Sequence, residues 1–307
     1  MSKLLANPRI ATSLVVSAIA LIGIAAATRL QDQSSRSILT RPAPPPDHRI
    51  AYGKDPLQFG ELRLPKGSGP HPVAVIIHGG CWMAEFGLSY MGHLAANLTE
   101  AGIATWNIEY RRVGNEGGGW PGTFQDVALG TEYLGTLAKT HSLDLNRVIA
   151  IGHSAGGHLA LWLAARKKLP KDSPLHHDGL LQLQGAIPLA AITDLRRTGT
   201  ACDRIVSKLM GGSPEDYQSR YQQASPIELL PLGVKQIVIQ GETDNIVPVA
   251  MAKDYAEAAK RKGDDVKLVV IEKAGHFELV DPQSFAWPKV KDEVMELVKF
   301  EKKGDSK

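Results

Sequence analysis

Short apolar runs alternate along the chain with longer segments in which apolar residues recur every three or four positions. The short runs predict strands and the longer segments predict helices. The run at 73–77 is apolar throughout, which is typical of a strand buried on both faces of a parallel sheet. This alternation predicts an α/β fold: a mostly parallel, doubly wound sheet with helices on both faces.

The expected globular domain covers residues 49–303. Its strands are expected at 50–52, 57–64, 73–77, 104–110, 147–151, 185–191, 235–240 and 266–271, and its helices at 88–101, 123–139, 155–166, 249–262 and 285–300. Residues 195–233 have no strand period and contain several glycine and proline turn signals. We therefore expect this segment to leave the sheet and to form a small cap.

The first 48 residues differ from the rest of the chain. Residues 10–28 are uncharged and largely apolar, and they end in three alanines that resemble a signal-peptide cleavage site. The run is also long enough to span a bilayer. Residues 1–28 are thus expected to be a signal peptide or a membrane anchor, with the domain exported (periplasmic or extracellular) or held at the membrane. Residues 29–48, with P-A-P-P-P at 42–46, predict a semi-rigid linker.

Composition narrows the possible functions only slightly. The 307 residues include 35 Lys and Arg and 32 Asp and Glu, a net charge of +3. Because no basic cluster is interleaved with aromatic residues, nucleic acid is not an expected partner. The two cysteines, Cys81 and Cys202, fit no metal-ligand spacing. They are expected to be incidental, and a single disulfide is the open alternative.

The strongest chemical signal is a glycine-rich turn between an expected strand and an expected helix. The sequence G-H-S-A-G at 152–156 fits the pattern G-x-S-x-G, which places a serine at the tip of a tight turn. Such a turn strains the serine backbone, and its glycines let strand and helix pass closely. Ser154 is therefore the candidate nucleophile. An ordinary glycine-rich turn is the alternative.

A serine hydroxyl needs a base, and the base needs a group that orients it. In chains with this turn the order is serine, carboxylate, histidine. Asp244 follows an expected strand and is the first candidate for the carboxylate, ahead of Glu242 and Asp194. His276 follows the next strand and is the only histidine downstream of Asp244, so it is the candidate base.

Negative charge developing on a carbonyl oxygen requires N–H donors, which form an oxyanion hole. The amide of Ala155, directly after the candidate nucleophile, is one expected donor. The segment H-G-G-C-W at 78–82 follows an early strand, and the amides of Gly80 and Cys81 are the other candidates. We expect His78 to hold this loop by hydrogen bonds. A turn without function is the alternative.

The remaining candidates are weaker. His153 and His158 flank the serine but precede the carboxylate, so we interpret both as packing residues. The loop at 117–121 is a further candidate for the wall of the site, with a purely structural turn as the alternative. Met210 and Tyr217 are candidate substrate contacts within the expected cap.

Taken in order, these motifs resemble the α/β-hydrolase superfamily, in particular its esterases, lipases and kynurenine-formamidase-like enzymes. The resemblance covers about residues 50–300. It implies the α/β-hydrolase fold and acyl transfer to water through a serine acyl-enzyme, with neither metal nor cofactor. Two positions depart from the pattern of hormone-sensitive-lipase-like esterases. Cys81 stands where a third glycine is usual, and His153 where an aspartate is usual.

The resemblance leaves the substrate open. The first hypothesis is hydrolysis of a small-molecule carboxylic ester with a small or medium acyl group, with Ser154 as nucleophile, His276 as base and acid, and Asp244 as orienter. An amidase such as an arylformamidase, or an exopeptidase, is the alternative within this chemistry. A non-catalytic binding protein is the alternative from another class, although no triad member is missing. Activity should rise through the pH range in which histidine deprotonates.

Overall fold

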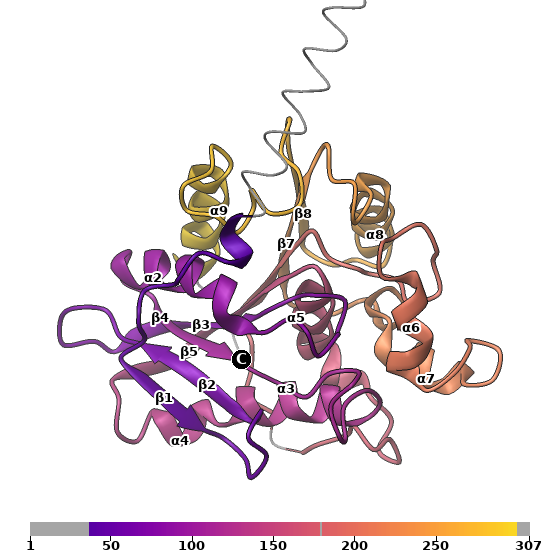
Figure 1. The fold of residues 1–307 in the computed structure, drawn as a ribbon, viewed down its shortest axis with the longest axis horizontal. Helices are drawn as coiled ribbons and strands as arrows, with labels where there is room; N and C mark the ends of the chain where they lie inside the picture. The colour runs from indigo at the N-terminus through magenta and orange to yellow at the C-terminus, as the bar shows by residue number, and fades with distance from the viewer. Residues whose placement is uncertain (1–36, 179, 300–307) are drawn as a thin grey trace, which may run out of the picture.

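The computed structural model describes residues 37–178 and 180–299, so the expected signal peptide or anchor lies outside the described residues. Eight strands form one sheet in the order β1-β2-β4-β3-β5-β6-β7-β8 (Figure 1). All neighbours from β4 to β8 are parallel, whereas β2 is antiparallel to both β1 and β4. The predicted mostly parallel sheet is confirmed.

Each expected strand is present. The strands are β1 (His48–Ala51), β2 (Phe59–Arg63), β3 (His71–Ile77), β4 (Ala104–Ile108), β5 (Leu143–His153), β6 (Gly185–Leu189), β7 (Lys235–Gly241) and β8 (Val266–Ile271). The α-helices are α2 (Gly92–Glu100), α3 (Gly122–Glu132), α4 (Leu134–Leu137), α5 (Ala155–Ala165), α6 (Asp203–Met210), α7 (Gln218–Ala224), α8 (Val249–Arg261) and α9 (Trp287–Lys299). Short 3₁₀ helices are η1 (Ser37–Leu39), η2 (Leu88–Met91), η3 (Arg166–Lys168) and η4 (Pro226–Leu229).

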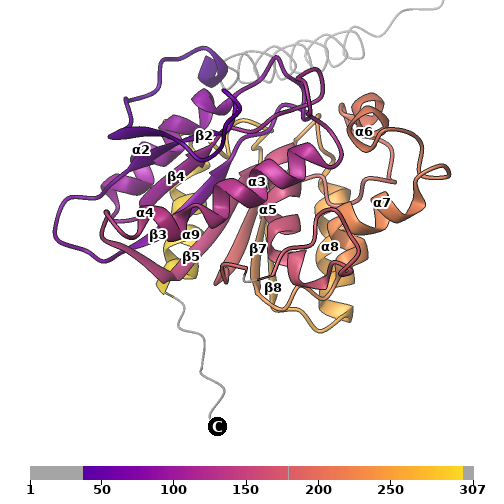
Figure 2. The ribbon, with the colours of Figure 1, turned by 90° about the horizontal axis from the view of Figure 1, so that it is seen from below.

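The central strands bury side chains on both faces of the sheet. In β3, Val73, Val75 and Ile77 belong to one core, and Ala74 and Ile76 to the other. Helices α3, α4, α5 and α8 contribute to the first core, and α2 and α9 to the second. Figure 2 shows α3 and α5 on the near side of the sheet. Burial on both faces explains why the strand sequence is apolar throughout.

The predicted cap leaves the sheet between β6 and β7. It contains α6, α7 and η4, and α6 and α7 lie together at one end of the sheet, near α8 (Figure 1). The loop at 117–121 supports it, because the amide of Trp120 donates to the carbonyl of Leu209 at 2.7 Å. No helix in the described part of the chain is both long and apolar enough to cross a membrane.

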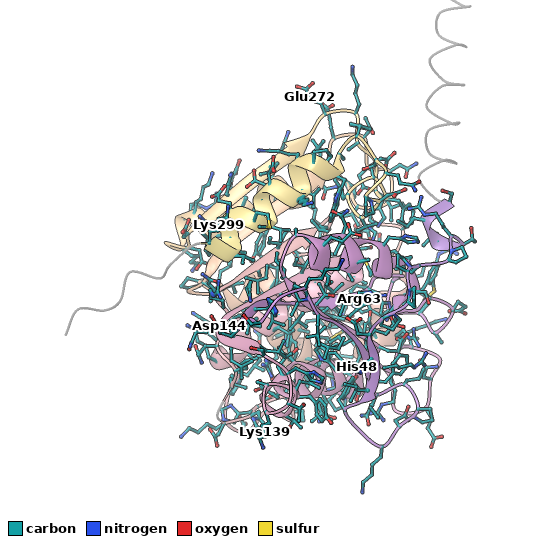
Figure 3. All side chains as sticks on the ribbon, turned by 90° about the vertical axis from the view of Figure 1, so that its left-hand side faces the viewer. His48, Arg63, Lys139, Asp144, Glu272 and Lys299 are labelled. Carbon is teal, nitrogen blue, oxygen red and sulfur yellow. A yellow bond between two sulfur atoms is a disulfide. The ribbon has the colours of Figure 1, made fainter. Side chains whose placement is uncertain are left out.

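The described N-terminal residues pack on the domain. Ile38 in η1 is fully buried in the core shared by α2 and α9. Arg63, labelled in Figure 3, donates from β2 to the carbonyl of Pro44 at 2.7 Å. Residues 37–48, which the sequence assigns to a linker, thus include side-chain and backbone contacts with the domain. A proline-rich run lacks N–H donors, but its carbonyls still accept hydrogen bonds. Burial of a neighbouring apolar side chain such as Ile38 is still favourable.

Candidate active site

Ser154 stands at the turn between β5 and α5. Its backbone has φ 57° and ψ −121°, a conformation that is costly for a residue other than glycine. A Cβ at Gly152 would lie 2.0 Å from the carbonyl oxygen of Gly156, and a Cβ at Gly156 would lie 2.1 Å from that of Ile77. The predicted strained serine and its two required glycines are therefore present.

Asp244 and His276 lie on the loops after β7 and β8 and form a buried pair. Nδ1 of His276 is 2.7 Å from Oδ2 of Asp244, and the two side chains are 4% and 0% exposed, respectively. An ionised carboxylate can only accept, so Nδ1 carries the proton. Nε2 of a neutral His276 is then a proton acceptor.

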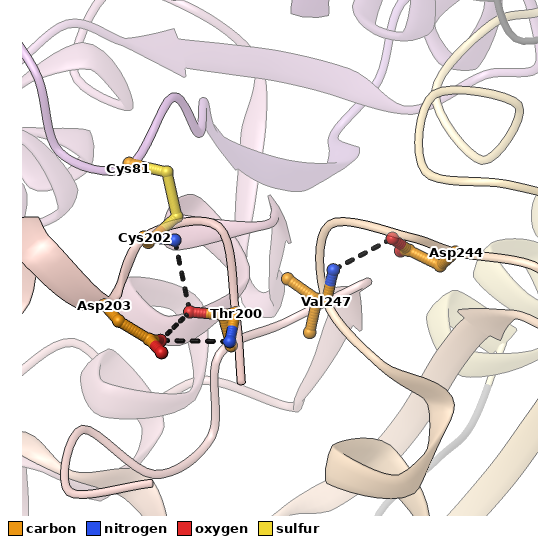
Figure 4. Close-up of a disulfide and its surroundings, with 6 residues drawn as sticks. All are labelled: Cys81, Thr200, Cys202, Asp203, Asp244 and Val247. Carbon is orange, nitrogen blue, oxygen red and sulfur yellow. Dashed lines mark hydrogen bonds between the residues drawn. A yellow bond between two sulfur atoms is a disulfide. The ribbon is translucent and has the colours of Figure 1, made fainter. Parts of the chain in front are cut away.

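The carboxylate of Asp244 is held by its own loop as well. Oδ1 accepts the amides of Ile246 at 2.8 Å and Val247 at 2.9 Å, and Figure 4 shows the bond from Val247. Oδ2 accepts Nε2 of Gln240 at 3.0 Å. These bonds fix the direction in which the carboxylate meets His276.

The other two carboxylate candidates lie elsewhere. Glu242 is exposed and accepts the amide of Lys273 at 3.1 Å. Asp194 accepts the amide of Arg196 at 2.8 Å in a local turn. Among the described residues, Asp244 is therefore the candidate that pairs with His276.

Ser154 and His276 line one cavity of about 230 Å³. Its other lining residues are largely apolar: Leu39, Gly80, Cys81, Met83, Phe86, Tyr90, His153, Ala201, Ile246 and Phe277. Within the described residues Ser154 and His276 share this cavity without a hydrogen bond to each other. Such a bond is often long until a substrate is present.

The three predicted oxyanion donors have amides without a competing acceptor. Among the described residues, the amides of Gly80 and Cys81 donate to nothing, whereas the neighbouring amide of Gly79 donates to the Tyr90 hydroxyl at 2.7 Å. Ala155 is the first residue of α5, so its amide has no partner within the helix. Gly80 and Cys81 also line the cavity. Their role as donors stays a prediction.

His78 holds the loop after β3 by hydrogen bonds, as predicted, but its main partner was missed in the sequence. Its Nε2 is 2.8 Å from Oε1 of Glu109, and its Nδ1 is 2.9 Å from the carbonyl oxygen of Gly79. Nη1 of Arg112 lies 2.9 Å from the same carboxylate oxygen. Burial raises the pKa of Glu109, but His78 and Arg112 outweigh it and lower that pKa overall. Glu109 directly follows β4, and this strand-end position was the available signal.

His153 connects three loops, which its interpretation as a packing residue did not anticipate. Its Nε2 is 3.0 Å from the carbonyl oxygen of His276, and its Nδ1 is 2.9 Å from the hydroxyl of Tyr90. A carbonyl can only accept, so Nε2 carries the proton and Nδ1 accepts from the hydroxyl. Burial, and then the charge of His276, lower the pKa of His153 well below its usual value. An aspartate here could not donate to that carbonyl.

His158 is a packing residue, as predicted. Its Nε2 donates to the carbonyl of Ala224 in the cap at 3.0 Å, and its ring meets Trp82 edge-on at a centroid distance of 5.2 Å. Burial lowers its pKa to about 4. The neutral ring therefore packs between the cap and the loop after β3.

Cys81 and Cys202 form a disulfide, so the expectation that they are incidental is wrong. The bond joins the loop after β3 to the residue before α6 (Figure 4). Nearby, the amide of Ala201 donates to the carbonyl of Ile246 at 3.0 Å. The cap is thus tied both to a candidate oxyanion loop and to the loop of Asp244. A separation of 121 residues gave no local signal for the pairing.

Two candidate substrate contacts, Met210 and Tyr217, are not among the residues that line this cavity. Met210 is fully buried in the core, and Tyr217 is 37% exposed. Tyr217 lines a separate, open cavity of about 800 Å³ together with Trp120 from the loop at 117–121. In the described ranges no group of three or more His, Cys, Asp or Glu residues could hold a metal ion.

Known proteins resemble this chain in sequence. The BD-FAE family matches residues 61–258. A probable isoprenylcysteine alpha-carbonyl methylesterase, ICMEL1 of Arabidopsis thaliana, is 25% identical over 246 residues, which cover 75% of this chain and 50% of that protein. Esterase LipC of Mycobacterium tuberculosis is 25% identical over 252 residues, which cover 76% of this chain and 60% of that protein. The chain thus spans about half the length of the curated relatives it matches.

The fold also matches solved structures. The thermophilic esterase Est2 of the planctomycete Thermogutta terrifontis superposes with a TM-score of 0.68 at 21% identity, over 85% of this chain and 95% of that one. Est2 has also been solved with propionate bound, with butyrate bound, and phosphonylated by sarin. At this identity the likeness shows the fold. The family match covers more than half of the chain, and the chain therefore belongs to the BD-FAE family of α/β-hydrolase esterases.

Proposed function

We propose that the protein is a serine hydrolase that cleaves carboxylic esters of small or medium acyl groups through an acyl-enzyme. The observation that carries this proposal is the content of one cavity. It is lined by Ser154 on a strained turn, by His276 with Nδ1 bonded to Asp244, and by Gly80 and Cys81, whose amides are the predicted donors. These are a nucleophile, a base with its orienter, and donors for an oxyanion.

In this mechanism Oγ of Ser154 attacks the ester carbonyl carbon while Nε2 of His276 accepts its proton. The three amides stabilise the oxyanion that forms. Asp244 holds Nδ1–H and stabilises the imidazolium, and it keeps its own negative charge. His276 then donates the proton to the leaving alcohol oxygen. In the second half, Nε2 of His276 takes a proton from water as it attacks the acyl carbon. The bond from that carbon to Oγ of Ser154 then breaks, Oγ takes back the proton from His276, and the acid is released.

The cavity supports a small and uncharged substrate. Its volume of about 230 Å³ lies below the roughly 300–1,000 Å³ of pockets for drug-sized ligands. No Lys, Arg, Asp or Glu is among the described residues that line it. Propionate and butyrate, which bind the esterase Est2, belong to the same size class.

Amide substrates receive less support. The matched relatives are named as esterases, which favours an ester over the amide of an arylformamidase. An exopeptidase would need a charged group to hold the free amino end of a peptide, and the described cavity walls offer no carboxylate.

We also propose that the domain works outside the cytoplasm, either released or anchored by residues 1–28. The disulfide between Cys81 and Cys202 supports this, because such bonds persist in oxidising compartments. Fractionation of cells that express the full chain tests it. Protein found with the periplasm, medium or membrane fits, and protein confined to the cytoplasm contradicts it.

The test of function compares the wild-type chain with Ser154→Ala in two assays: labelling by a fluorophosphonate probe and hydrolysis of p-nitrophenyl acetate and butyrate. We expect Ser154→Ala to lose labelling and to lose kcat by at least about 10⁴-fold. Ser219→Ala on α7 is the matched control and should behave as wild type. The wild-type activity should rise from pH 5 to 8. Folded wild-type protein that neither labels nor turns over would overturn the proposal.

A further inference from the structure

We propose that residues 37–41 form one wall of the substrate cavity and that Leu39 limits the size of the ester group that fits there. The inference rests on the proposed esterase function. Its starting observation is that Leu39 lines the cavity of Ser154 and His276, although it precedes the first strand of the domain.

Leu39 is placed by the residue before it. Ile38 is fully buried in the core of α2 and α9, so it anchors η1. Leu39 is only half-buried, packs on the same core as Phe277, and shares the cavity with that residue. Neighbouring positions thus differ in role: Ile38 fixes the turn, and Leu39 presents apolar surface to the cavity.

Polar contacts hold the other end of the segment. The guanidinium of Arg41 lies 2.5 Å from Oδ1 of Asp281 and donates to Oε1 of Gln283 at 2.7 Å. Nε2 of His93, on α2, donates to the carbonyl of Arg41 at 3.2 Å. The Asp281 carboxylate is 9% exposed, so water screens this ion pair less than it would a surface pair. The segment is therefore fixed at both ends around Leu39.

The cap forms another part of the wall. Ala201 and Ile246 line the cavity and are hydrogen-bonded to each other through their backbones. The space of about 230 Å³ is therefore bounded by segments that precede and follow the central strands. In such an apolar pocket one methylene changes discrimination by about 10–200-fold. Shortening or enlarging Leu39 should therefore change which esters fit.

The experiment uses the full chain with Leu39→Ala and Leu39→Trp. Two series of substrates are compared by kcat/KM: p-nitrophenyl esters from acetate to octanoate, and acetates of methanol, phenol and 1-naphthol. In one series, Leu39→Ala should raise the ratio of kcat/KM for the longest ester to kcat/KM for the shortest ester by about 10-fold. Leu39→Trp should lower that ratio by a similar factor. A change in the first series assigns Leu39 to the acyl side, and a change in the second assigns it to the alcohol side.

Two further variants separate this role from general loosening. Leu129→Ala on α3, where Leu129 is 44% exposed, is the matched control and should keep the wild-type preference. Arg41→Gln should shift the preference in the direction of Leu39→Ala, by a smaller factor, because the wall stays but is held less firmly. If Leu39→Ala does not fold, Leu39→Val should shift the preference in the same direction by a smaller factor.

The inference and the proposed function fail in different ways. If the Leu39 variants hydrolyse both series with the wild-type preference while Ser154→Ala is inactive, the inference is overturned and the esterase function stands. If Ser154→Ala remains fully active, the proposed function fails. A change of preference caused equally by Leu129→Ala would also count against a specific role for Leu39.

Discussion

The catalytic side of the cavity and its walls are built in different ways. Ser154 directly follows β5, and Asp244 and His276 lie on the loops after β7 and β8. The Asp244 carboxylate is held by its own loop and by His276. The walls instead use Leu39 from before the sheet and Ala201 from the cap, which are held by contacts between distant parts of the chain. Each catalytic candidate is thus marked by a local sequence signal, whereas the shape of the pocket depends on long-range packing.

His153 connects the loops that carry the catalytic candidates. The amide of Gly79 donates to the Tyr90 hydroxyl, which donates to His153, which in turn donates to the carbonyl of His276. All four groups in this series of hydrogen bonds are buried, so breaking any one bond would leave a buried polar group without a hydrogen-bond partner. These three hydrogen bonds connect the candidate oxyanion loop, the serine turn and the loop of the base.

The largest expected effect tests the catalytic side of the cavity. Asp244→Asn should lower kcat by about 10⁴-fold while the protein stays folded, because an amide nitrogen facing Nδ1 would favour the wrong tautomer of His276. Esterase kinetics together with circular dichroism measure both outcomes. Glu242→Gln is the matched control, since Glu242 is exposed and lies on the same loop. Loss of activity in Glu242→Gln but not in Asp244→Asn would mean that the carboxylate is wrongly assigned.

The second prediction tests the walls of the cavity, which depend on long-range contacts. The double variant Cys81→Ser, Cys202→Ser should lower the free energy of unfolding by about 2–5 kcal/mol, because the disulfide closes a long loop in the unfolded chain. It should also lower kcat by about 10-fold or more, since Cys81 belongs to the candidate oxyanion loop. Urea unfolding and ester hydrolysis, each with and without dithiothreitol, provide the measurements.

Reductant supplies the control for that variant. Dithiothreitol should lower the free energy of unfolding and the kcat of the wild type toward the values of the double variant. It should leave the double variant unchanged, because Cys81 and Cys202 are the only cysteines in the chain. If the double variant matches the oxidised wild type in both stability and kcat, the disulfide does not support the wall, and the contrast between the two sides of the cavity loses its main example.

The candidates on the catalytic side could be proposed from the sequence because short patterns mark them. Apolar periodicity marked the strands, a five-residue motif marked Ser154, and chain order with strand ends marked Asp244 and His276. The walls could not be predicted in this way. The pairing of Cys81 with Cys202 depends on where the cap folds back, which no short pattern specifies.

The N-terminal segment shows the same limit. Its proline-rich composition predicted a linker, and tertiary contacts overrode that composition once Ile38 found a place in the core. Tyr90 and Glu109 were missed for a related reason. Each acts through a partner from another element. The strand-end position of Glu109 was a sequence signal, but its partner His78 is apparent only in the folded chain.

The smallest expected effect is a dependence of stability on pH that comes from the wall side. His158 packs between Trp82 and Ala224, and burial lowers its pKa to about 4 from the usual 6.5. Between these values the unfolded chain binds a proton at this site and the folded chain does not. The stabilising contribution is therefore complete above pH 6.5 and is lost as the pH falls toward 4, by about 3 kcal/mol.

Urea unfolding between pH 7 and 4 measures this loss. His158→Gln keeps a donor for the Ala224 carbonyl but cannot titrate, so the variant should be less stable at pH 7 and should lose about 3 kcal/mol less on acidification than wild type. His177→Gln, at an exposed position, should keep the wild-type slope. Equal slopes for His158→Gln and wild type would show that the acid sensitivity arises elsewhere, and His153, the other buried histidine with a strongly lowered pKa, would be the next position to test.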